Sequence, residues 1–283
     1  MITKIVGAGT RAGLVALLFA LPAILLPSVG SDAIQIMMLF ALLAGCLVFV
    51  EYVSNAPSIL EFRYAPPFNR LRYLAIFLTV FALSVIARGE VAPNAFTAFL
   101  HALGQLVGDA IDFPYSPVRL MVIMLPNNAT PELVAQVRTA AGLSYLISLV
   151  TLVVFYFYVR VLGWPARNGA FNVWVNLPLF DPTAGGDVMP RLLRDGRLNI
   201  LLGFLMPFLI PAIVQMMSDL IDPIHLSDPK TMIWTMSAWA FIPASMIMRG
   251  IAMTRVATLI NENRQRAYAA THAGHAQVTS SAA

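Results

Sequence analysis

The 283-residue chain is too apolar to fold as an ordinary water-soluble protein. Hydrophobic residues make up 59% of it, charged residues only 11%, and the mean hydropathy is +0.76. Soluble domains carry about 25% charged residues. The net charge of +4 gives no reason to expect a nucleic-acid partner, because the basic residues stand at the ends of apolar segments, where they set membrane orientation. With Cys46 as its single cysteine, the chain can build neither a disulfide framework nor a thiolate metal site.

Six segments have the length and composition of membrane spans, since a bilayer core of about 30 Å requires about 20 helical residues. We predict them at about 12–28, 34–54, 71–87, 140–162, 198–221 and 231–252. The predicted fold class is therefore all-α: a polytopic membrane helix bundle, built as one domain over residues 1–270. The small, polar segment 271–283 is expected to be a disordered tail.

The first of these segments has an alternative interpretation. Its apolar stretch is short, and small residues follow it, so residues 1–30 could be a cleaved signal peptide. A retained helix is favoured because Pro22 and Pro27 are tolerable within a helix bundle and the second span follows almost at once.

Residues 94–125 are predicted to form an amphipathic segment on the periplasmic side. Apolar residues from Phe96 to Ile111 follow helical spacing, and the run 118–125 is too short to cross a membrane. We expect an interfacial or re-entrant hairpin that Asp112 and Arg119 could close by pairing across its turn. Its polar stripe offers three candidate cavity-lining residues: His101, Gln105 and Asp109. The water-facing side of an interfacial helix would show the same pattern.

The distribution of basic residues predicts the orientation of the chain. With both termini in the cytoplasm of a bacterial cell, only four of the 18 basic residues lie on the periplasmic side of the inner membrane: Arg88, Arg119, Arg138 and Lys230. The positive-inside rule predicts this bias, and the opposite orientation would invert it.

The loop 164–197 is the longest polar interruption, and on this topology it faces the cytoplasm. Two carboxylates near a Gly-Gly pair could hold a divalent ion or ligand, and two arginines could bind phosphate. An interfacial loop with arginines near anionic lipid explains the same residues without chemistry. The candidate ligand or headgroup contacts are Asn168, Asn172, Asn176, Asp181, Asp187, Arg191 and Arg194.

Ionisable residues within the spans give little support for ion-coupled transport. Glu51 and Asp219 both lie near span ends, whereas a coupled transporter usually needs a midplane carboxylate or a broken helix. Pro207 and Pro211 are the one hint of a kinked helix. No metal site, cofactor or catalytic group is predicted.

Three stretches carry a resemblance to a family: WPARNGAFNVWVNLPLFDPTAGGDV, IDFPYSPVRL and AWAFIPASMIMRGIAM. They look like uncharacterised multi-pass inner-membrane proteins of alphaproteobacteria, over about residues 55 to 260. The resemblance implies a location and a kind of protein, and it brings no known activity.

The leading functional prediction is a non-enzymatic structural, assembly or accessory protein of the inner membrane. Its expected partners are the lipid bilayer and either other membrane proteins or further copies of the chain. Two alternatives stay open: a small-solute or lipid transporter, and a membrane-embedded enzyme that acts on a lipid headgroup through the 164–197 loop. The enzyme alternative requires Asp181, Asp187, Arg191 and Arg194 to converge on one pocket.

Overall fold

The computed structural model describes residues 2–27, 30–55, 58–126, 128–165, 172–180, 186–217 and 226–281. Among these residues, side chains are described as far as Ala269, apart from that of Trp174. Among these residues, six helices are long and apolar enough to cross a membrane: α1 (Ile2–Leu25), α2 (Ser31–Val53), α3 (Phe68–Gly89), α6 (Pro131–Arg160), α8 (Val188–Met216) and α9 (Pro229–Ser281). The predicted fold class, the helical bundle of a multi-pass membrane protein, is confirmed.

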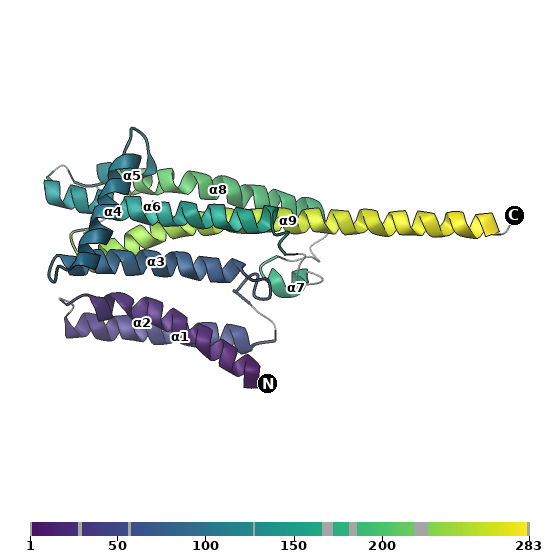
Figure 1. Ribbon diagram of the computed structural model, residues 1–283, viewed down its shortest axis with the longest axis horizontal. Helices are drawn as coiled ribbons and strands as arrows, with labels where there is room; N and C mark the ends of the chain where they lie inside the picture. The colour runs from purple at the N-terminus through teal and green to yellow at the C-terminus, as the bar shows by residue number, and fades with distance from the viewer. Residues whose placement is uncertain are drawn as a thin grey trace.

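The long helices lie alongside one another and run in alternating directions (Figure 1). One end of the bundle carries four segments: the start of α1, the α2–α3 loop, the short helix α7 (Val173–Asn176) and the C-terminal part of α9. We call this the arginine-rich end, after Arg63, Arg70, Arg72 and Arg191. The opposite end, called the far end, carries α4 (Ala95–Ile111) and α5 (Pro117–Ile123).

The segment at 94–125 forms two helices, as its pattern predicts. The Asn94 side chain accepts hydrogen bonds from the backbone N–H groups of Phe96 and Thr97, and the Thr97 hydroxyl accepts one from the Asn94 N–H. This capping box fixes the start of α4. Helix α4 lies across the axes of the long helices at the far end (Figure 1). Its depth in a bilayer, interfacial or re-entrant, stays a prediction.

Helix α8 continues through the two prolines that were expected to kink it. Pro211 has no N–H to donate to the carbonyl of Pro207, four residues earlier. The indole N–H of Trp239, on α9, donates to that carbonyl instead, at 3.1 Å. A neighbouring helix thus satisfies the backbone group that the proline leaves free, as a proline within a membrane helix requires.

Two clusters of buried side chains hold the bundle together. The cluster toward the far end joins α1, α3, α5, α6 and α9, and includes Leu18, Val80, Met121, Met236 and Trp239. The cluster at the arginine-rich end is aromatic and joins the α2–α3 loop to α6, α8 and α9, with Phe62, Phe68, Phe155, Trp164 and Met248 among its members.

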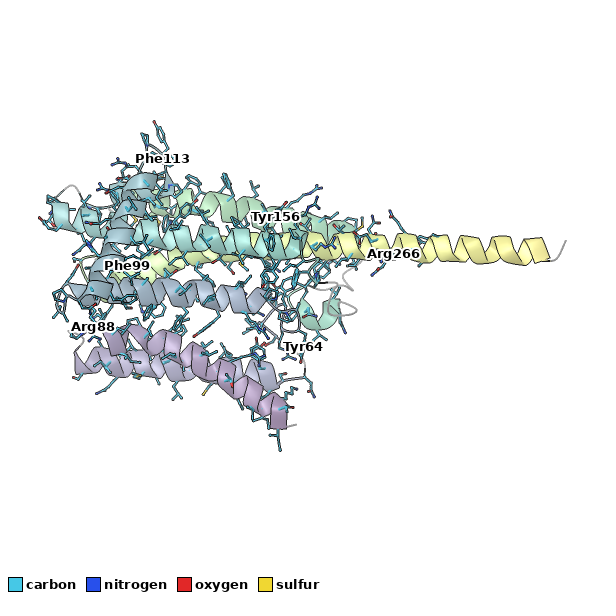
Figure 2. All side chains as sticks on the ribbon, in the orientation of Figure 1. Tyr64, Arg88, Phe99, Phe113, Tyr156 and Arg266 are labelled. Atoms are coloured by element: carbon cyan, nitrogen blue, oxygen red, sulfur yellow. The ribbon has the colours of Figure 1, made fainter. Side chains whose placement is uncertain are left out.

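Large apolar side chains also cover the outer surface of the bundle (Figure 2). Phe99, Phe113 and Tyr156 are each more than half exposed and point outward. Helix α2 buries only three residues, Ala41, Gly45 and Glu51. Such surfaces suit lipid tails, which are as apolar as leucine.

Several helices extend beyond the predicted spans. Helix α1 begins at Ile2, α6 at Pro131 and α8 at Val188, because hydropathy marks only the part of a helix that fits the bilayer. Helix α9 continues to Ser281, through an alanine-rich stretch with high helix propensity and no proline to end it. Disorder of the tail 271–283 stays a prediction.

Candidate functional site

The asparagines of the 164–197 loop serve the fold where the structure describes them. Asn168 lies outside the described residues. Asn176 is buried, and its side-chain oxygen accepts a hydrogen bond from the backbone N–H of Tyr64 at 3.0 Å. Its backbone carbonyl accepts another from Phe62, and its amide donates to the carbonyl of Asn172 at 3.0 Å. Asn176 therefore ties α7 to the α2–α3 loop.

The charged residues of the same loop that the structure describes have different partners and do not form one pocket. Asp181 lies outside the described residues. Both oxygens of Asp187 contact Arg264 of α9 at 2.8 Å. The guanidinium of Arg191 lies 4.9 Å from the ring centre of Phe180.

Arg194 is largely exposed and pairs with Asp195 at 3.4 Å. The convergence that a headgroup enzyme would require is therefore not seen among the described members of the set.

The polar stripe of α4 divides between a cavity and the protein surface. His101 lines a cavity of about 90 Å³ at the far end, together with Glu90, Gln136 and residues of α3 and α9. Gln136 donates a hydrogen bond to Glu90 at 2.7 Å. Gln105 and Asp109 are exposed and are not among the residues that line this cavity.

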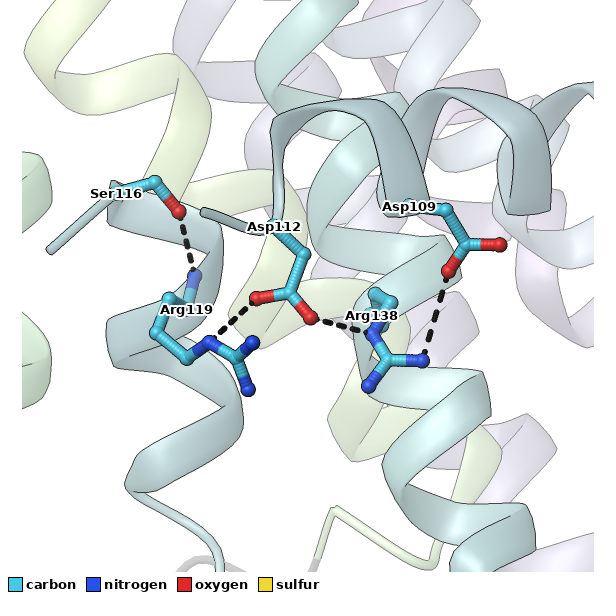
Figure 3. A network of polar contacts seen from close by, with 5 residues as sticks. All are labelled: Asp109, Asp112, Ser116, Arg119 and Arg138. Atoms are coloured by element: carbon cyan, nitrogen blue, oxygen red, sulfur yellow. Dashed lines mark hydrogen bonds and ion pairs between the residues drawn. The ribbon is translucent and has the colours of Figure 1, made fainter. Parts of the chain in front are cut away.

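The turn of the far-end hairpin is closed by an ion-pair network around Asp112 (Figure 3). One oxygen of the buried Asp112 carboxylate lies 2.9 Å from Arg119 on α5, and the other lies 2.7 Å from Arg138 on α6. Asp109 approaches Arg138 at 3.5 Å. The predicted Asp112–Arg119 pair is confirmed, and Arg138 extends it so that α4, α5 and α6 are joined.

A second buried carboxylate orders the α2–α3 loop. Glu51 accepts hydrogen bonds from the backbone N–H groups of Ser58, Ile59 and Leu60, and from the Ser58 hydroxyl. Arg63 donates to the backbone carbonyls of Glu51 and Ser54. Glu51, which the sequence places near a span end as a candidate ionic group, therefore acts as an anchor for the loop.

This loop places Glu61 against α9 in a strong ion pair that sequence reasoning missed. The two oxygens of Glu61 lie 2.5 Å from Nε and 2.8 Å from an Nη of Arg249. Glu61 is 6% exposed, and Asn69 holds its backbone by donating to its carbonyl at 2.7 Å. Such bidentate, charge-assisted contacts are among the strongest polar interactions in proteins.

Arg72 lies beside this pair and has no ion-pair partner among the described residues. Its Nε is buried, and the Nε–H group has no acceptor within hydrogen-bonding distance among the described residues. One Nη lies 3.4 Å from the Asn69 side-chain oxygen. The guanidinium is also near the rings of Phe68 and Phe241, at 5.4 and 5.8 Å from their centres.

Glu61, Arg72 and Arg249 share a pocket of about 290 Å³ between α3 and α9. Apart from Ser245, the rest of its lining is apolar: Ile59, Leu179, Phe241, Ile242 and Met246. Sequence reasoning counted Arg72 and Arg249 only as orientation charges. The available signal was their position within the helices, because an arginine inside an apolar helix needs a partner.

The described part of the chain holds no group of three or more His, Cys, Asp or Glu residues arranged to bind a metal ion. Nor do comparisons supply a function. The chain matches no protein-family model, and no curated protein or solved structure is significantly similar to it. Fold and site together define a multi-pass helical membrane protein with a mixed ionic and apolar pocket between α3 and α9 at the arginine-rich end.

Proposed function

We propose that this chain is a non-enzymatic accessory or assembly protein of the bacterial inner membrane, acting through binding. The observation that supports the proposal is the use made of its charged side chains. Asp112, Glu61 and Asp187 each bind an arginine of another helix. These groups hold the helices together, and the described loop residues that were candidates for chemistry have separate partners.

The proposed orientation places the arginine-rich end in the cytoplasm. That end carries most of the basic residues, which the positive-inside rule assigns to the cytoplasmic side. The far end, with α4 and α5, would then face the periplasm, and the α9 extension would reach into the cytoplasm.

Transport of a small solute is the second candidate, and one observation favours it. His101 lines a cavity at the far end with Glu90 and Gln136. The cavity holds about 90 Å³, whereas ligand pockets usually measure about 300–1,000 Å³. Its polar lining lies at one end of the bundle and not at the midplane, where transporters bind their substrates. We therefore place transport second.

The proposal is tested by purifying the tagged chain in a mild detergent and identifying co-purifying proteins by mass spectrometry. A stoichiometric membrane-protein partner that survives size-exclusion chromatography is the expected result. An unrelated tagged membrane protein of similar hydropathy serves as the control. If the chain is isolated without any partner, and crosslinking in intact membranes before solubilisation also captures none, the accessory role is rejected.

A further inference from the structure

We propose that the pocket between α3 and α9 binds the phosphate of an anionic phospholipid, with Arg72 as the anchoring cation. The inference goes beyond the proposed function because it concerns a lipid ligand and not a protein partner. It can fail while an accessory role stands.

The first step is the state of the Arg72 guanidinium. It carries five N–H donors, yet its buried Nε has no hydrogen-bond partner, and among the described residues its hydrogen bond is to the Asn69 side chain, at 3.4 Å. A buried donor without an acceptor is costly. The rings of Phe68 and Phe241 lie close enough to restrict the guanidinium plane. The side chain is thus positioned, and an acceptor is missing.

The second step is that the neighbouring carboxylates do not supply this acceptor. Both oxygens of Glu61 are engaged by Arg249, at 2.5 and 2.8 Å. Asp195 adds a negative charge near Arg249, but it pairs with Arg194. The lining therefore contains two guanidinium groups and one carboxylate, which leaves one positive charge in excess. Phosphate matches the fork of an arginine with two parallel hydrogen bonds.

The third step concerns the rest of the pocket, which suits an acyl chain better than a free anion. Arg249 and Phe241 are separated by eight residues on α9, or about 12 Å of helix. The arginine is the nearer of the two to the arginine-rich end. Along α9 the lining consequently changes from charged at that end to apolar toward the bundle centre, with Phe241 and Ile242. The Arg72 guanidinium, from α3, lies 5.8 Å from the ring centre of Phe241, where the charged part of the lining meets the apolar part. Ile242 and Leu179 are 45% and 63% exposed, so the pocket reaches the outer surface of the bundle.

This order of groups matches a lipid that stands in the leaflet at the arginine-rich end. Its phosphate would lie at the level of Arg72, and an acyl chain would follow α9 past Phe241. Basic pockets between membrane helices on the cytoplasmic side are known to hold anionic headgroups.

The experiment compares lipid retention by the full-length chain and two matched variants. The protein is reconstituted in nanodiscs of phosphatidylcholine, with or without phosphatidylglycerol, and the lipid that it keeps after transfer to detergent is counted by native mass spectrometry. The native chain should retain phosphatidylglycerol. Arg72→Gln should weaken this binding about tenfold or more, because it removes a charge-assisted bidentate contact. Arg70→Gln, at an exposed arginine two residues away on α3, should bind like the native chain.

Equal losses in the two arginine variants would show general attraction to an anionic surface and would overturn the proposal. So would a native chain that retains no more phosphatidylglycerol than phosphatidylcholine. Ser245→Leu provides a test that keeps every charge: it fills the pocket from α9 and should also abolish retention.

A last measurement uses inorganic phosphate alone, to distinguish a free anion from a lipid headgroup. If it raises the thermal unfolding midpoint of the native chain as much as phosphatidylglycerol does, the ligand is a free anion and the lipid assignment is wrong.

Discussion

At the scale of single residues, the buried carboxylates of this protein are held by donors from distant parts of the chain. Glu51 is held mainly by backbone N–H groups, whereas Glu61 is held by an arginine 188 residues later. Burying a charge is unfavourable unless it is paired and hydrogen-bonded. Each carboxylate therefore fixes the position of the segment that supplies its donors. Loss of a carboxylate should destabilise both its own segment and the segment of its donors.

Replacing Glu61 by glutamine should destabilise the protein by about 2 kcal/mol. This is less than the roughly 3–5 kcal/mol expected when one partner of a fully buried pair is removed, because the Arg249 side chain is 27% exposed. The measurement is the free energy of unfolding in detergent. Asp195→Asn breaks the exposed contact with Arg194 and should cost less than about 1 kcal/mol. Equal losses of unfolding free energy in the two variants would show that the Glu61–Arg249 pair stabilises the protein no more than the exposed pair does.

Asp187 should make the docking of α8 on α9 sensitive to acid. Hydrogen bonds from Arg264, and then from the backbone N–H of Met189, hold the pKa of Asp187 below its ordinary value. A carboxyl whose pKa is lowered on folding stabilises the folded state above its unfolded pKa of about 3.9. That stability is lost as the pH falls through the lower, folded pKa.

The measured quantity is the difference in unfolding midpoint between the native chain and Asp187→Asn as the pH is lowered. It should be constant above about pH 5 and shrink below about pH 4, while titration of the other carboxyls cancels in the difference. A difference that grows in acid would contradict the assignment.

At the scale of secondary-structure elements, the far-end hairpin depends on Asp112. This side chain contacts Arg119 and Arg138 at 2.9 and 2.7 Å and is 6% exposed, so Asp112→Asn should leave Arg119 without a charged partner. Arg138 would keep only its longer, more exposed contact with Asp109 at 3.5 Å. We expect a loss of about 3 kcal/mol and faster amide exchange across α4 and α5. Asp109→Asn, at the more exposed 3.5 Å contact, should cost less than about 1 kcal/mol. An unchanged exchange rate in Asp112→Asn would show that packing alone holds the hairpin.

The contact of α4 with α6 also requires two glycines. A Cβ atom added at Gly142 would lie 2.5 Å from the Cα of Gly108, so Gly142→Ala should force the two backbones apart. Overpacking of this kind costs about 1–3 kcal/mol. Gly13→Ala on α1 is the matched control, because no atom lies within 4 Å of its added Cβ. Thermal unfolding midpoints should fall for the first variant only; a fall in both would point to a general effect on helices.

The sequence predicts these elements better than it predicts their contacts. All six long helices were located because hydropathy is a local property, and Asp112–Arg119 was foreseen because its members flank one turn. Arg138 and the Glu61–Arg249 pair were missed because their members meet only after the bundle packs. The regular spacing of Asn172 and Asn176 is visible in the sequence. The role of Asn176 is not, because the backbone N–H group that it binds, that of Tyr64, lies in a loop more than 100 residues earlier.

At the scale of the whole molecule, the described charged groups gather at the two ends of the bundle, and the buried polar side chains between them are uncharged hydroxyls such as Ser84, Ser148 and Ser237. The far end holds the Asp112 network and the His101 cavity, and the arginine-rich end holds the Glu61 pair and the pocket that contains Arg72. This division is what a bilayer around the middle of the bundle would require, since charged groups are costly at its centre. The two ends should therefore face different compartments.

Cysteine labelling tests this division directly. Asn128 precedes α6 and Asn172 follows it, and both are exposed. The 30 residues of α6 span about 45 Å, more than the roughly 30 Å of a bilayer core. In a Cys46→Ser background, Asn128→Cys should react with an impermeant maleimide added to intact spheroplasts, whereas Asn172→Cys should react only after permeabilisation. Reversed accessibility would keep six spans but invert the proposed orientation, and with it the leaflet that supplies lipid to the Arg72 pocket. Labelling of both positions from one side would remove α6 from the spans and leave the six-helix topology untenable.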